Sequence, residues 1–572
     1  MIIRIDMTTK EIKKQAVPKK YALLGGRGLT SRMILDEVNP LCNPLGPGNK
    51  VIIASGLLGG SAAPCSGRLS IGAKSPLTGG IKESNGGGTA AVKLSKIGIK
   101  ALVVEGQPEE DKLYLLKVTP EGVELLPADE LKGKGNYETV KILKQKYGNN
   151  YSILSIGPAG ERGYSMASIA ITDMEGNPSR HCGRGGMGAV LGSKKIKAVL
   201  IDDKGTRGVT YKKDEKEFKR IAREWSKTLI QTKAILTNFG TANLVTPMNA
   251  LGVLPTKNFS TGCFENAEKI SGEHLRELLE QRGGAYGHPC HPGCVIRCSN
   301  VFKDENGEYV TSALEYETIG LLGANCGIGN LDLVARLDRF CDDFGIDTME
   351  LGVTIGVVME SGMISFGDEK GVMQLIEELE KDSIMGKLIG QGAAVTGRVL
   401  GVQRVPSVKG QGISSYDPRA LKGTGVTYAT SPMGADHTAG NCLPGRKGYR
   451  PETMKDFDVT EAEGQWELSK DLQLMTAVCD YCGLCFFVGP TWENMEIISQ
   501  LINARYGCSL SKDDVIALAK QLIKTEVEFN LRAGIPQSAN GLPEFFYREK
   551  LGPKELTFDI SEERLQRIFD NL

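Results

Sequence analysis

Residues 341–347 read Cys-Asp-Asp-Phe-Gly-Ile-Asp, and residues 479–485 read Cys-Asp-Tyr-Cys-Gly-Leu-Cys. Each copy follows a segment with helical periodicity, and its glycine stands where a helix is expected to stop. A carboxylate at such a helix end can accept two parallel N–H bonds from an amino-pyrimidine edge, which pterins present. Two copies would suit two pterins. Two unrelated helix caps are the alternative that the motif alone leaves open.

A group of cysteines lies ahead of the first copy, where residues 290–298 read Cys-His-Pro-Gly-Cys-Val-Ile-Arg-Cys. Proline and glycine break any helix here, so the thiols of this loop can turn inward. A [4Fe–4S] cluster needs four thiolates, three often local and one distant. Cys485 is the candidate fourth because it stands where the first copy has Asp347. A structural zinc site using His288 or His291, and buried free cysteines, are the alternatives.

The chain around these motifs divides into a β-rich part and a helical part. Apolar runs of strand length, bounded by turn residues, lie at 51–54, 69–72, 101–104, 113–116 and 198–201. Helical periodicity covers 214–232, 271–282, 331–344, 371–399, 461–481 and 512–529, whereas 405–450 is Gly/Pro-rich and loop-like. We therefore predict an α+β protein with a two-sheet amino-terminal β domain over 1–205, followed by two mainly α-helical domains over 206–407 and 408–572.

Composition limits the classes of protein. The chain of 572 residues is too long for one hydrophobic core. Its 69 basic and 69 acidic side chains cancel, which gives no drive toward nucleic acid or an anionic membrane. We see no signal peptide and no apolar run of spanning length, so we expect a cytoplasmic protein without a membrane anchor. The 14 cysteines are clustered, which favours metal binding over disulfides.

Glycine is the outlier of the composition, with 71 residues. Short strings such as Ser-Asn-Gly-Gly-Gly at 84–88 and Gly-Arg-Gly-Gly-Met-Gly at 183–188 can form anion sites from backbone N–H groups and nearby arginine. Tight β turns are the alternative. The second string satisfies G-x-G-x-x-G. We predict no Rossmann motif there, because 180–182 does not read as a strand and Lys194-Lys195 follows too soon for a full helix.

Two segments offer acid–base groups. Glu317 lies in Leu-Glu-Tyr-Glu-Thr at 314–318, and His437 lies in the polar loop 434–440. A positioned glutamate or histidine can move a proton during carbonyl oxidation. A solvated glutamate pair and a surface-loop histidine are the alternatives, and spacing alone favours these.

Taken together and in this order, the motifs resemble the aldehyde ferredoxin oxidoreductase family over essentially the whole chain. The resemblance implies one metal, tungsten or alternatively molybdenum, held by two pterins, with a [4Fe–4S] cluster close by and magnesium bridging the pterin phosphates. It implies oxidation of a small-molecule aldehyde to a carboxylic acid. The electrons would pass to ferredoxin or to an iron–sulfur or flavin partner subunit, and the chain would form a homodimer or a hetero-oligomer.

The resemblance also assigns individual residues to these roles. Phosphate and magnesium contacts fall on Arg68, Asn85, Gly87, Cys182 and Arg184. The two pterin motifs fall on Asp342, Asp347, Asp480 and Leu484. The cluster ligands fall on Cys290, Cys294, Cys298 and Cys485. Proton-handling residues fall on Glu317 and His437, with the glutamate as the general base.

The sequence departs from the family pattern in three respects. The cluster motif is C-x-x-x-C-x-x-x-C, whereas the family has C-x-x-C-x-x-x-C. Some relatives carry an interface iron on an E-x-x-H-like arrangement, but Arg336 stands where the acidic ligand would be, so we predict no such metal. Four further cysteines are candidates to lie near the cofactor, one even as a metal ligand: Cys65, Cys326, Cys442 and Cys482.

Two other functions stay open at this point. One is a low-potential reductase of the benzoyl-coenzyme A reductase type, with the same cofactor acting on an acyl thioester inside a larger complex. The other is not an enzyme but a zinc-stabilised binding protein with Gly-rich loops. Metal content separates the second from both enzymes.

Overall fold

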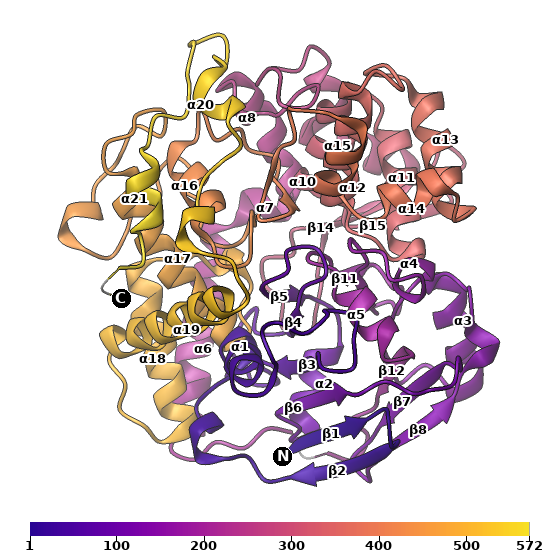
Figure 1. Ribbon diagram of the computed structural model, residues 1–572. Helices are drawn as coiled ribbons and strands as arrows, with labels where there is room; N and C mark the ends of the chain where they lie inside the picture. Colours follow the sequence, from indigo (N-terminus) through magenta and orange to yellow (C-terminus); the bar gives the residue numbers. More distant parts are fainter. Residues whose placement is uncertain (207, 571) are drawn as a thin grey trace.

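The amino-terminal part of the protein consists of two six-stranded sheets, drawn in indigo and purple in Figure 1. The computed structural model describes residues 1–206, 208–570 and 572. The first sheet has the order β2 (Glu11–Gln15), β1 (Ile2–Asp6), β6 (Ala101–Glu105), β3 (Val51–Ser55), β4 (Leu69–Lys74), β5 (Ile81–Gly86). The second has the order β11 (Arg180–Cys182), β10 (Ile169–Ile171), β9 (Ser152–Ser155), β12 (Ile196–Ile201), β7 (Tyr114–Val118), β8 (Val123–Pro127).

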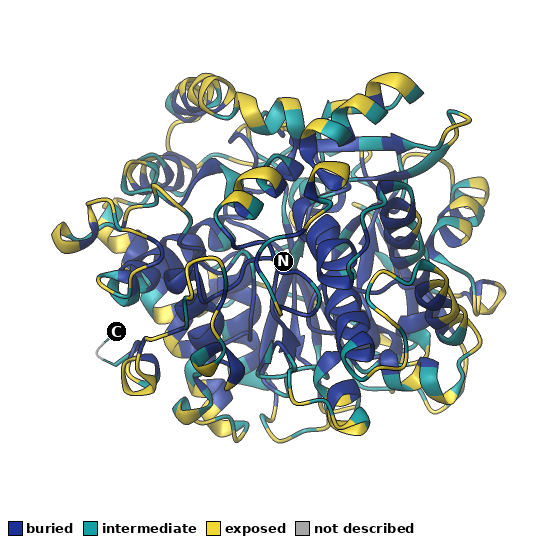
Figure 2. Cartoon of the chain, turned by 90° about the horizontal axis from the view of Figure 1, so that it is seen from above, coloured by how far each residue is buried: buried dark blue, intermediate teal, exposed yellow. Residues whose placement is uncertain are grey.

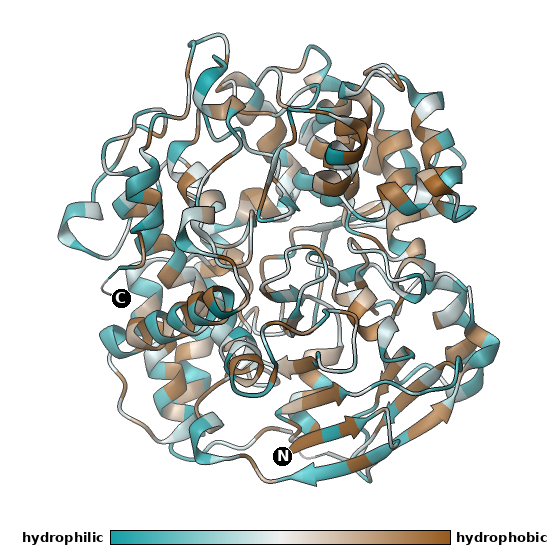
Figure 3. Ribbon diagram, viewed as in Figure 1, coloured by the Kyte–Doolittle hydropathy of each residue, from teal (hydrophilic) through white to brown (hydrophobic). Residues whose placement is uncertain are grey.

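One hydrophobic core joins the two sheets. Ile53 and Leu102 of the first sheet belong to the same buried cluster as Leu154 and Val199 of the second. The other face of the first sheet is covered by helix α1 (Gly26–Glu37). Central strands are therefore buried on both faces, which explains their continuous apolar runs. Figure 3 shows the contrast with β2, whose exposed, lysine-bearing edge is hydrophilic.

Helices form the rest of the molecule, in magenta, orange and yellow in Figure 1. The longer ones in the middle of the chain are α6 (Glu215–Thr232), α9 (Gly272–Arg282), α11 (Leu331–Phe344) and α12 (Thr348–Glu360). Toward the carboxyl end they are α17 (Gln465–Cys482), α18 (Trp492–Tyr506) and α19 (Lys512–Arg532). A β-sheet part followed by helical parts confirms the predicted fold class; the domain boundaries at 205/206 and 407/408 stay predictions.

The two motif copies end their helices as predicted. α11 stops at Gly345 with φ 81°, and α17 stops at Gly483 with φ 72°, both in the left-handed region that suits glycine. After the first stop, the Asp347 carboxylate accepts a hydrogen bond from the Met349 N–H at 3.0 Å and caps α12. The predicted cap is therefore present.

The cysteine loop connects two strands of a small sheet. β13 (Ala285–His288) and β14 (Ser299–Lys303) pair antiparallel, and β15 (Tyr309–Ser312) completes this three-stranded sheet. Residues 289–298 form the connection between β13 and β14. Both ends of the loop are thus anchored, and the chain turns between them at Gly293, which has φ 82°.

Three local predictions were wrong. Residues 180–182 form β11, a short edge strand that pairs antiparallel with β10. The rejection of a Rossmann motif still holds, since β11 is not a neighbour of β12 and the unit is not parallel. The segment 405–450 contains helix α16 (Lys422–Thr430). The pattern over 371–399 is broken into α13 (Glu369–Glu380), α14 (Ile384–Ile389) and α15 (Ala393–Leu400), because Ser383 and Gly392 start new helices.

Burial is concentrated in the sheets and in the helix faces turned toward them, as the dark blue centre of Figure 2 shows. Within the described residues, no single helix is long and apolar enough to cross a membrane. One bent pair, 316–326 with 331–344, satisfies length and composition together at an angle of 118°. Helix α10 (Tyr316–Leu322) of this pair is buried throughout, as expected for a core helix.

Candidate cofactor and active site

A cavity of about 340 Å³ lies where the sheets meet the helices. Most of the predicted site residues line it: Arg68, Asn85, Gly87, Arg184, Cys290, Cys298, Glu317, Asp342, Asp347, His437, Asp480 and Cys485. Two others point elsewhere: the Cys182 thiol faces the Leu69 carbonyl at 3.7 Å inside the sheet core, and Leu484 is buried in a hydrophobic cluster. The structure therefore assembles residues from all three parts of the chain around one cavity.

The first motif copy is held by a buried arginine. The Arg184 guanidinium donates from Nε to Asp347 at 3.0 Å, and its Nη2 lies 3.4 Å from Glu350. Glu350 also accepts backbone N–H groups from Ala393 at 3.0 Å and Gly412 at 2.7 Å. Burial raises the pKa of Glu350, and Arg184 opposes that rise. This network fixes Asp347 at the start of α12.

Asp342 is approached by a histidine and lies beside a second acid. His181 Nε2 is 2.9 Å from the Asp342 carboxylate. The Thr311 hydroxyl donates to Asp338 at 2.6 Å and lies 3.4 Å from Asp342. Burial, reinforced by the charge of Asp342, raises the pKa of Asp338 well above its ordinary range. Two buried carboxyls here suit a polar ligand edge that donates hydrogen bonds.

The second motif copy is bound to the amino-terminal helix. Arg27 of α1 donates to Asp480 at 3.1 Å and to Glu526 of α19 at 2.7 Å. Asn85 Nδ2 lies 3.5 Å from the other Asp480 oxygen. Burial raises the pKa of Asp480 although Arg27 opposes it, and the pKa of Glu83 is raised by burial and by Asp480. The carboxylate of each copy is therefore held by one buried arginine.

The glycine strings bring backbone close to the cysteine loop. A Cβ added at Gly87 would lie 3.2 Å from the Cys290 carbonyl oxygen, and the Gly88 N–H donates to that oxygen at 2.8 Å. Arg68 donates to the Asn85 carbonyl at 2.8 Å. Cationic side chains and glycine backbone at one end of the cavity fit phosphate groups.

The four predicted cluster cysteines gather at this same end. Cys294 is buried behind the cavity wall, beside Cys290, and the ligand atoms of Cys290, His291 and Cys294 lie within 4.8 Å of one another. Burial raises the pKa of Cys298, and the thiols of Cys485 and Cys294 add to that rise. Three buried cysteines and the half-buried Cys290 at this site fit an iron–sulfur cluster, while Cys290, His291 and Cys294 alone would also fit a single ion.

The four further cysteines differ in where they lie relative to the cavity. Cys65 lies beside the cluster cysteines: its N–H donates to the Gly293 carbonyl, and its own carbonyl accepts the Cys485 N–H, both at 2.9 Å. The other three are buried side chains that do not line the cavity: Cys326, Cys442 and Cys482.

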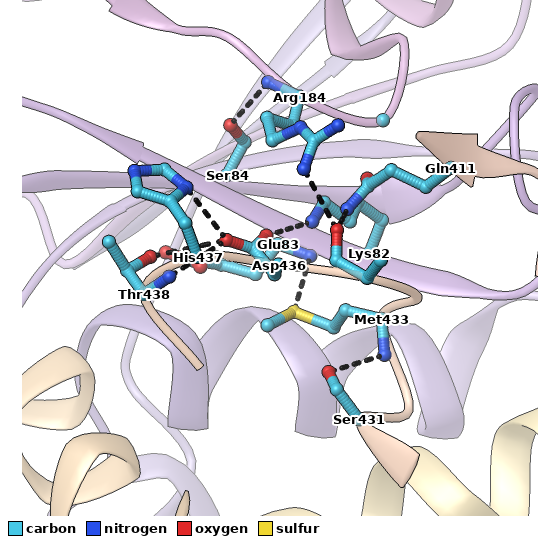
Figure 4. Close-up of polar contacts among 12 residues, drawn as sticks. Lys82, Glu83, Ser84, Arg184, Gln411, Ser431, Met433, Asp436, His437 and Thr438 are labelled. Atoms are coloured by element: carbon cyan, nitrogen blue, oxygen red, sulfur yellow. Dashed lines mark hydrogen bonds and ion pairs between the residues drawn. The ribbon is translucent and has the colours of Figure 1, made fainter. Parts of the chain in front are cut away.

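Glu317 and His437 face the cavity from different elements. The Ser415 N–H donates to Glu317 at 2.7 Å. Burial raises the pKa of Glu317, and the nearby His437 opposes that rise. His437 Nδ1 lies 3.4 Å from Asp436, without the alignment of a hydrogen bond. Figure 4 shows Asp436 between His437 and Lys82. Although burial acts the other way, Lys82 and His437 hold the pKa of Asp436 well below its ordinary range.

The comparisons with known proteins agree with this geometry. The family model of the aldehyde ferredoxin oxidoreductase N-terminal domain matches residues 2–203, and the model of its domains 2 and 3 matches residues 217–570.

The chain belongs to the aldehyde ferredoxin oxidoreductase family.

Relatives within this family are similar over nearly the full length. The chain is 32% identical to the tungsten-containing aldehyde ferredoxin oxidoreductase of Pyrococcus horikoshii, over 99% of this chain and 95% of the relative. It is 33% identical to the protein of that name from Thermococcus kodakarensis, over 99% and 94%. It is 26% identical to the WOR-like subunit of an aliphatic sulfonate oxidoreductase from Pyrococcus furiosus, over 80% and 77%.

A solved structure shares the fold. The active-site complex BamBC of benzoyl coenzyme A reductase, with 1,5-dienoyl-CoA, superposes with a TM-score of 0.81 over 99% of this chain and 93% of that chain, at 18% identity. At this identity the likeness shows the fold alone. As a member of the aldehyde ferredoxin oxidoreductase family, the protein is an oxidoreductase.

Sequence reasoning missed several residues of this family site. Asp436, whose carboxylate lies 3.4 Å from His437 Nδ1, stands directly before it, so adjacency was the available signal. Lys82 and Glu350 act on the site from distant segments, and no sequence signal connects them to it. Arg180 also lines the cavity, and its Nε is buried without a hydrogen-bond partner among the described residues. Its place just before the second glycine string was a usable hint.

Proposed function

We propose that this protein oxidises aldehydes to carboxylic acids in the cytoplasm. The observation that carries the proposal is the convergence of Glu317 and His437, both Asp motifs and the cluster cysteines on one cavity. The reaction takes one aldehyde and one water to one carboxylate, three protons and two electrons. The relatives of similar length carry aldehyde and tungsten in their names, which supports this substrate class and this metal.

The donor set indicates which residues would hold the cofactors. Asp342, Asp347 and Asp480 would bind the amino-pyrimidine edges of two pterins, with Arg68 and Arg184 at the phosphate end, where magnesium would bridge the phosphates. The four cysteines would hold one [4Fe–4S] cluster. When bound, a tungsten or molybdenum bis-pterin accepts the two electrons of the reaction and the cluster passes them on singly.

Glu317 is the general base of this proposal. The buried carboxylate would take the proton from water or from the hydrated aldehyde, and its fixed bond from the Ser415 N–H keeps it in position. His437 would donate a hydrogen bond to the carbonyl oxygen and stabilise developing charge there. The Asp436 carboxylate lies 3.4 Å from Nδ1 of the same ring.

The electrons require an acceptor outside the chain. Four cysteines supply one cluster, so ferredoxin or an iron–sulfur or flavin subunit would complete the reaction. Association with such a subunit, or with a second copy of this chain, is part of the proposal.

The test is Glu317→Gln in anaerobically purified protein. The amide cannot take a proton, so we expect aldehyde turnover with a viologen dye to fall by at least about 100-fold at unchanged tungsten and iron content. In the wild type, kcat/KM should rise as the pH increases through the raised pKa of Glu317, since only the ionised form is a base. Unchanged turnover of the fully loaded variant would remove Glu317 from this role.

Elemental analysis separates the alternatives. Zinc without tungsten, molybdenum or iron would exclude both enzyme functions. Co-purifying flavin and iron–sulfur subunits, together with no oxidation of simple aldehydes, would instead favour the low-potential reductase. Steady oxidation of an aldehyde panel would support the proposal.

A further inference from the structure

Arg446 is a half-buried cation on the wall of the active-site cavity. Its guanidinium takes part in none of the ion pairs or side-chain hydrogen bonds of the described residues. Burial lowers the pKa of Arg446, and the neighbouring groups that raise it are Tyr416, Cys442 and Cys479. No carboxylate is among them. A desolvated cation without a partner is costly, so such a group usually indicates an anionic ligand.

Two other buried arginines of the site are neutralised by acids, whereas Arg180 has His288 as its side-chain contact. Arg27 is paired with Glu526 and Asp480, and Arg184 with Asp347 and Glu350. Arg446 has instead the face of an aromatic ring: its guanidinium carbon lies 5.4 Å from the centre of Phe486. The ring supports the guanidinium from one side and leaves its N–H groups free for a ligand.

Arg446, Tyr416 and the proposed base line the same cavity. Both groups are near the Tyr416 phenol: beyond the effect of burial, Glu317 raises the pKa of that phenol and Arg446 lowers it. The Tyr416 ring packs on Tyr316 with centroids 5.0 Å apart, which fixes it in place. The same cavity is also lined by the apolar residues Leu244, Leu443 and Phe487.

We propose that Arg446 binds an anionic group at the far end of the substrate, so that the preferred aldehydes carry a carboxylate or a phosphate separated from the carbonyl by an apolar or aromatic body. The carbonyl end lies at Glu317 and His437, the body lies along Tyr416, and the anion meets the guanidinium. Arg446 is thus a specificity-determining residue. This inference rests on the proposed function, because it names the substrate class of the same site.

A competing role for the same cation is contact with an acidic electron acceptor. Lys233 lies near both Arg446 and Cys485: burial and Arg446 lower the pKa of Lys233, while the Cys485 thiol raises it. The substrate role is favoured because Arg446 lines the same cavity as Glu317, whereas Lys233 does not line it. A dye acceptor removes the protein partner from the assay and so distinguishes the two roles.

The experiment compares matched aldehydes on the holoenzyme with a viologen dye: 4-formylbenzoate, 4-formylphenyl phosphate and the uncharged 4-methylbenzaldehyde. A charge-assisted pair is lost in Arg446→Met, so kcat/KM for the anionic aldehydes relative to the uncharged one should fall about tenfold to a hundredfold, mainly through KM. Arg446→Lys should restore part of the carboxylate preference. The two anionic substrates show which anion is preferred.

Lys447→Met is the matched control. Lys447 is the exposed neighbour of Arg446 and does not line the cavity, and its substitution removes the same charge. It should leave the anionic-to-neutral ratio as in the wild type. An unchanged ratio in Arg446→Met, with tungsten and iron retained, would overturn the inference. So would a variant whose only change is a higher KM for a ferredoxin acceptor, which would assign Arg446 to partner binding.

A binding measurement keeps the two proposals separable. Calorimetric titration of the holoenzyme with 1,4-benzenedicarboxylate should show binding that Arg446→Met weakens at least about tenfold and that added salt also weakens. If no aldehyde is oxidised, the proposed function fails, while this titration still decides whether Arg446 is an anion site. Equal binding to wild type and variant would reject that site.

Discussion

The two copies of the Cys-Asp-x-x-Gly motif end their helices in the same way and continue differently. In the first, Asp347 follows Gly345 and at once caps α12, and both of its oxygens are engaged, by Met349 and Arg184. In the second, Cys485 takes the equivalent place, a 3-10 turn over Phe486–Val488 follows, and α18 begins only at Trp492.

The same kind of helix ending is therefore followed by a carboxylate in one copy and by a thiol in the other. A carboxylate at this position starts a new helix and is fixed by it. A cysteine leaves the position uncapped, so its thiol stays free toward the cavity while its backbone N–H is bound by Cys65. Under the proposed function, the second copy carries a cluster ligand where the first has a helix cap.

The largest effect that tests this difference between the copies is expected from Cys485→Ala. If the thiol is the fourth ligand, the variant should lose most of its iron and acid-labile sulfide, together with the electron paramagnetic resonance signal of the reduced cluster. Cys482→Ala is the control: Cys482 is also buried, three positions earlier, and does not line the cavity. Full iron content in Cys485→Ala would show that the second copy supplies no ligand.

A smaller effect, on the free energy of unfolding, is expected when the motif carboxylates are replaced. Asp347→Ala and Asp480→Ala each remove one acid from a buried arginine that keeps a second acid, so each should cost less than the roughly 3–5 kcal/mol of a fully broken buried pair. Asp347→Ala also removes the α12 cap and should cost about 1 kcal/mol more than Asp480→Ala. Guanidinium unfolding of equally loaded proteins measures this difference.

Asp347→Asn separates the charge from the cap in that comparison. The amide keeps an oxygen for the Met349 N–H but gives up the ion pair with Arg184, so its cost should lie below that of Asp347→Ala. If the two substitutions destabilise the protein equally, the cap contributes nothing measurable to stability. The two copies would then not differ in a stabilising helix cap.

The smallest expected effect concerns the glycines. Gly345→Ala and Gly483→Ala both place a Cβ on a left-handed residue, which costs about 1 kcal/mol. The new Cβ would lie 2.7 Å from the Gly157 backbone N at the first position, against 3.0 Å from the Gly56 backbone at the second. Gly345→Ala should therefore unfold at the lower denaturant concentration. The reverse order would show that the second stop is packed more tightly.

Local signals in the sequence predicted much of the fold. The helix over 331–344 was predicted with both ends from its periodicity and from the stop at Gly345, and the structure adds a cap by Asn330 at its start. The central strands were found because both of their faces are buried. The break at Gly392 was missed, since the apolar periodicity continues across it on either side.

The site was predictable only where residues stand in motifs. The proposed cluster cysteines and both Asp motifs carry recognisable patterns, whereas Glu317 was assigned only through the family resemblance. Lys82 contacts Asp436 across 354 positions of the chain. Arg446 is distinguished because, among the described residues, no carboxylate is one of the groups that shift its pKa. Neither property is encoded locally, so a single sequence does not reveal it.

The backbone bonds of Cys65 have a consequence for how the enzyme is made. They connect residue 65 to residue 293 and to residue 485, so the cluster pocket is closed by segments from the beginning, middle and end of the chain. Contacts between segments so far apart form late, because closing long loops costs entropy before the contacts can repay it. A ribosome-bound fragment therefore lacks the pocket, and we expect the cell to load the cofactors after the whole chain has been released.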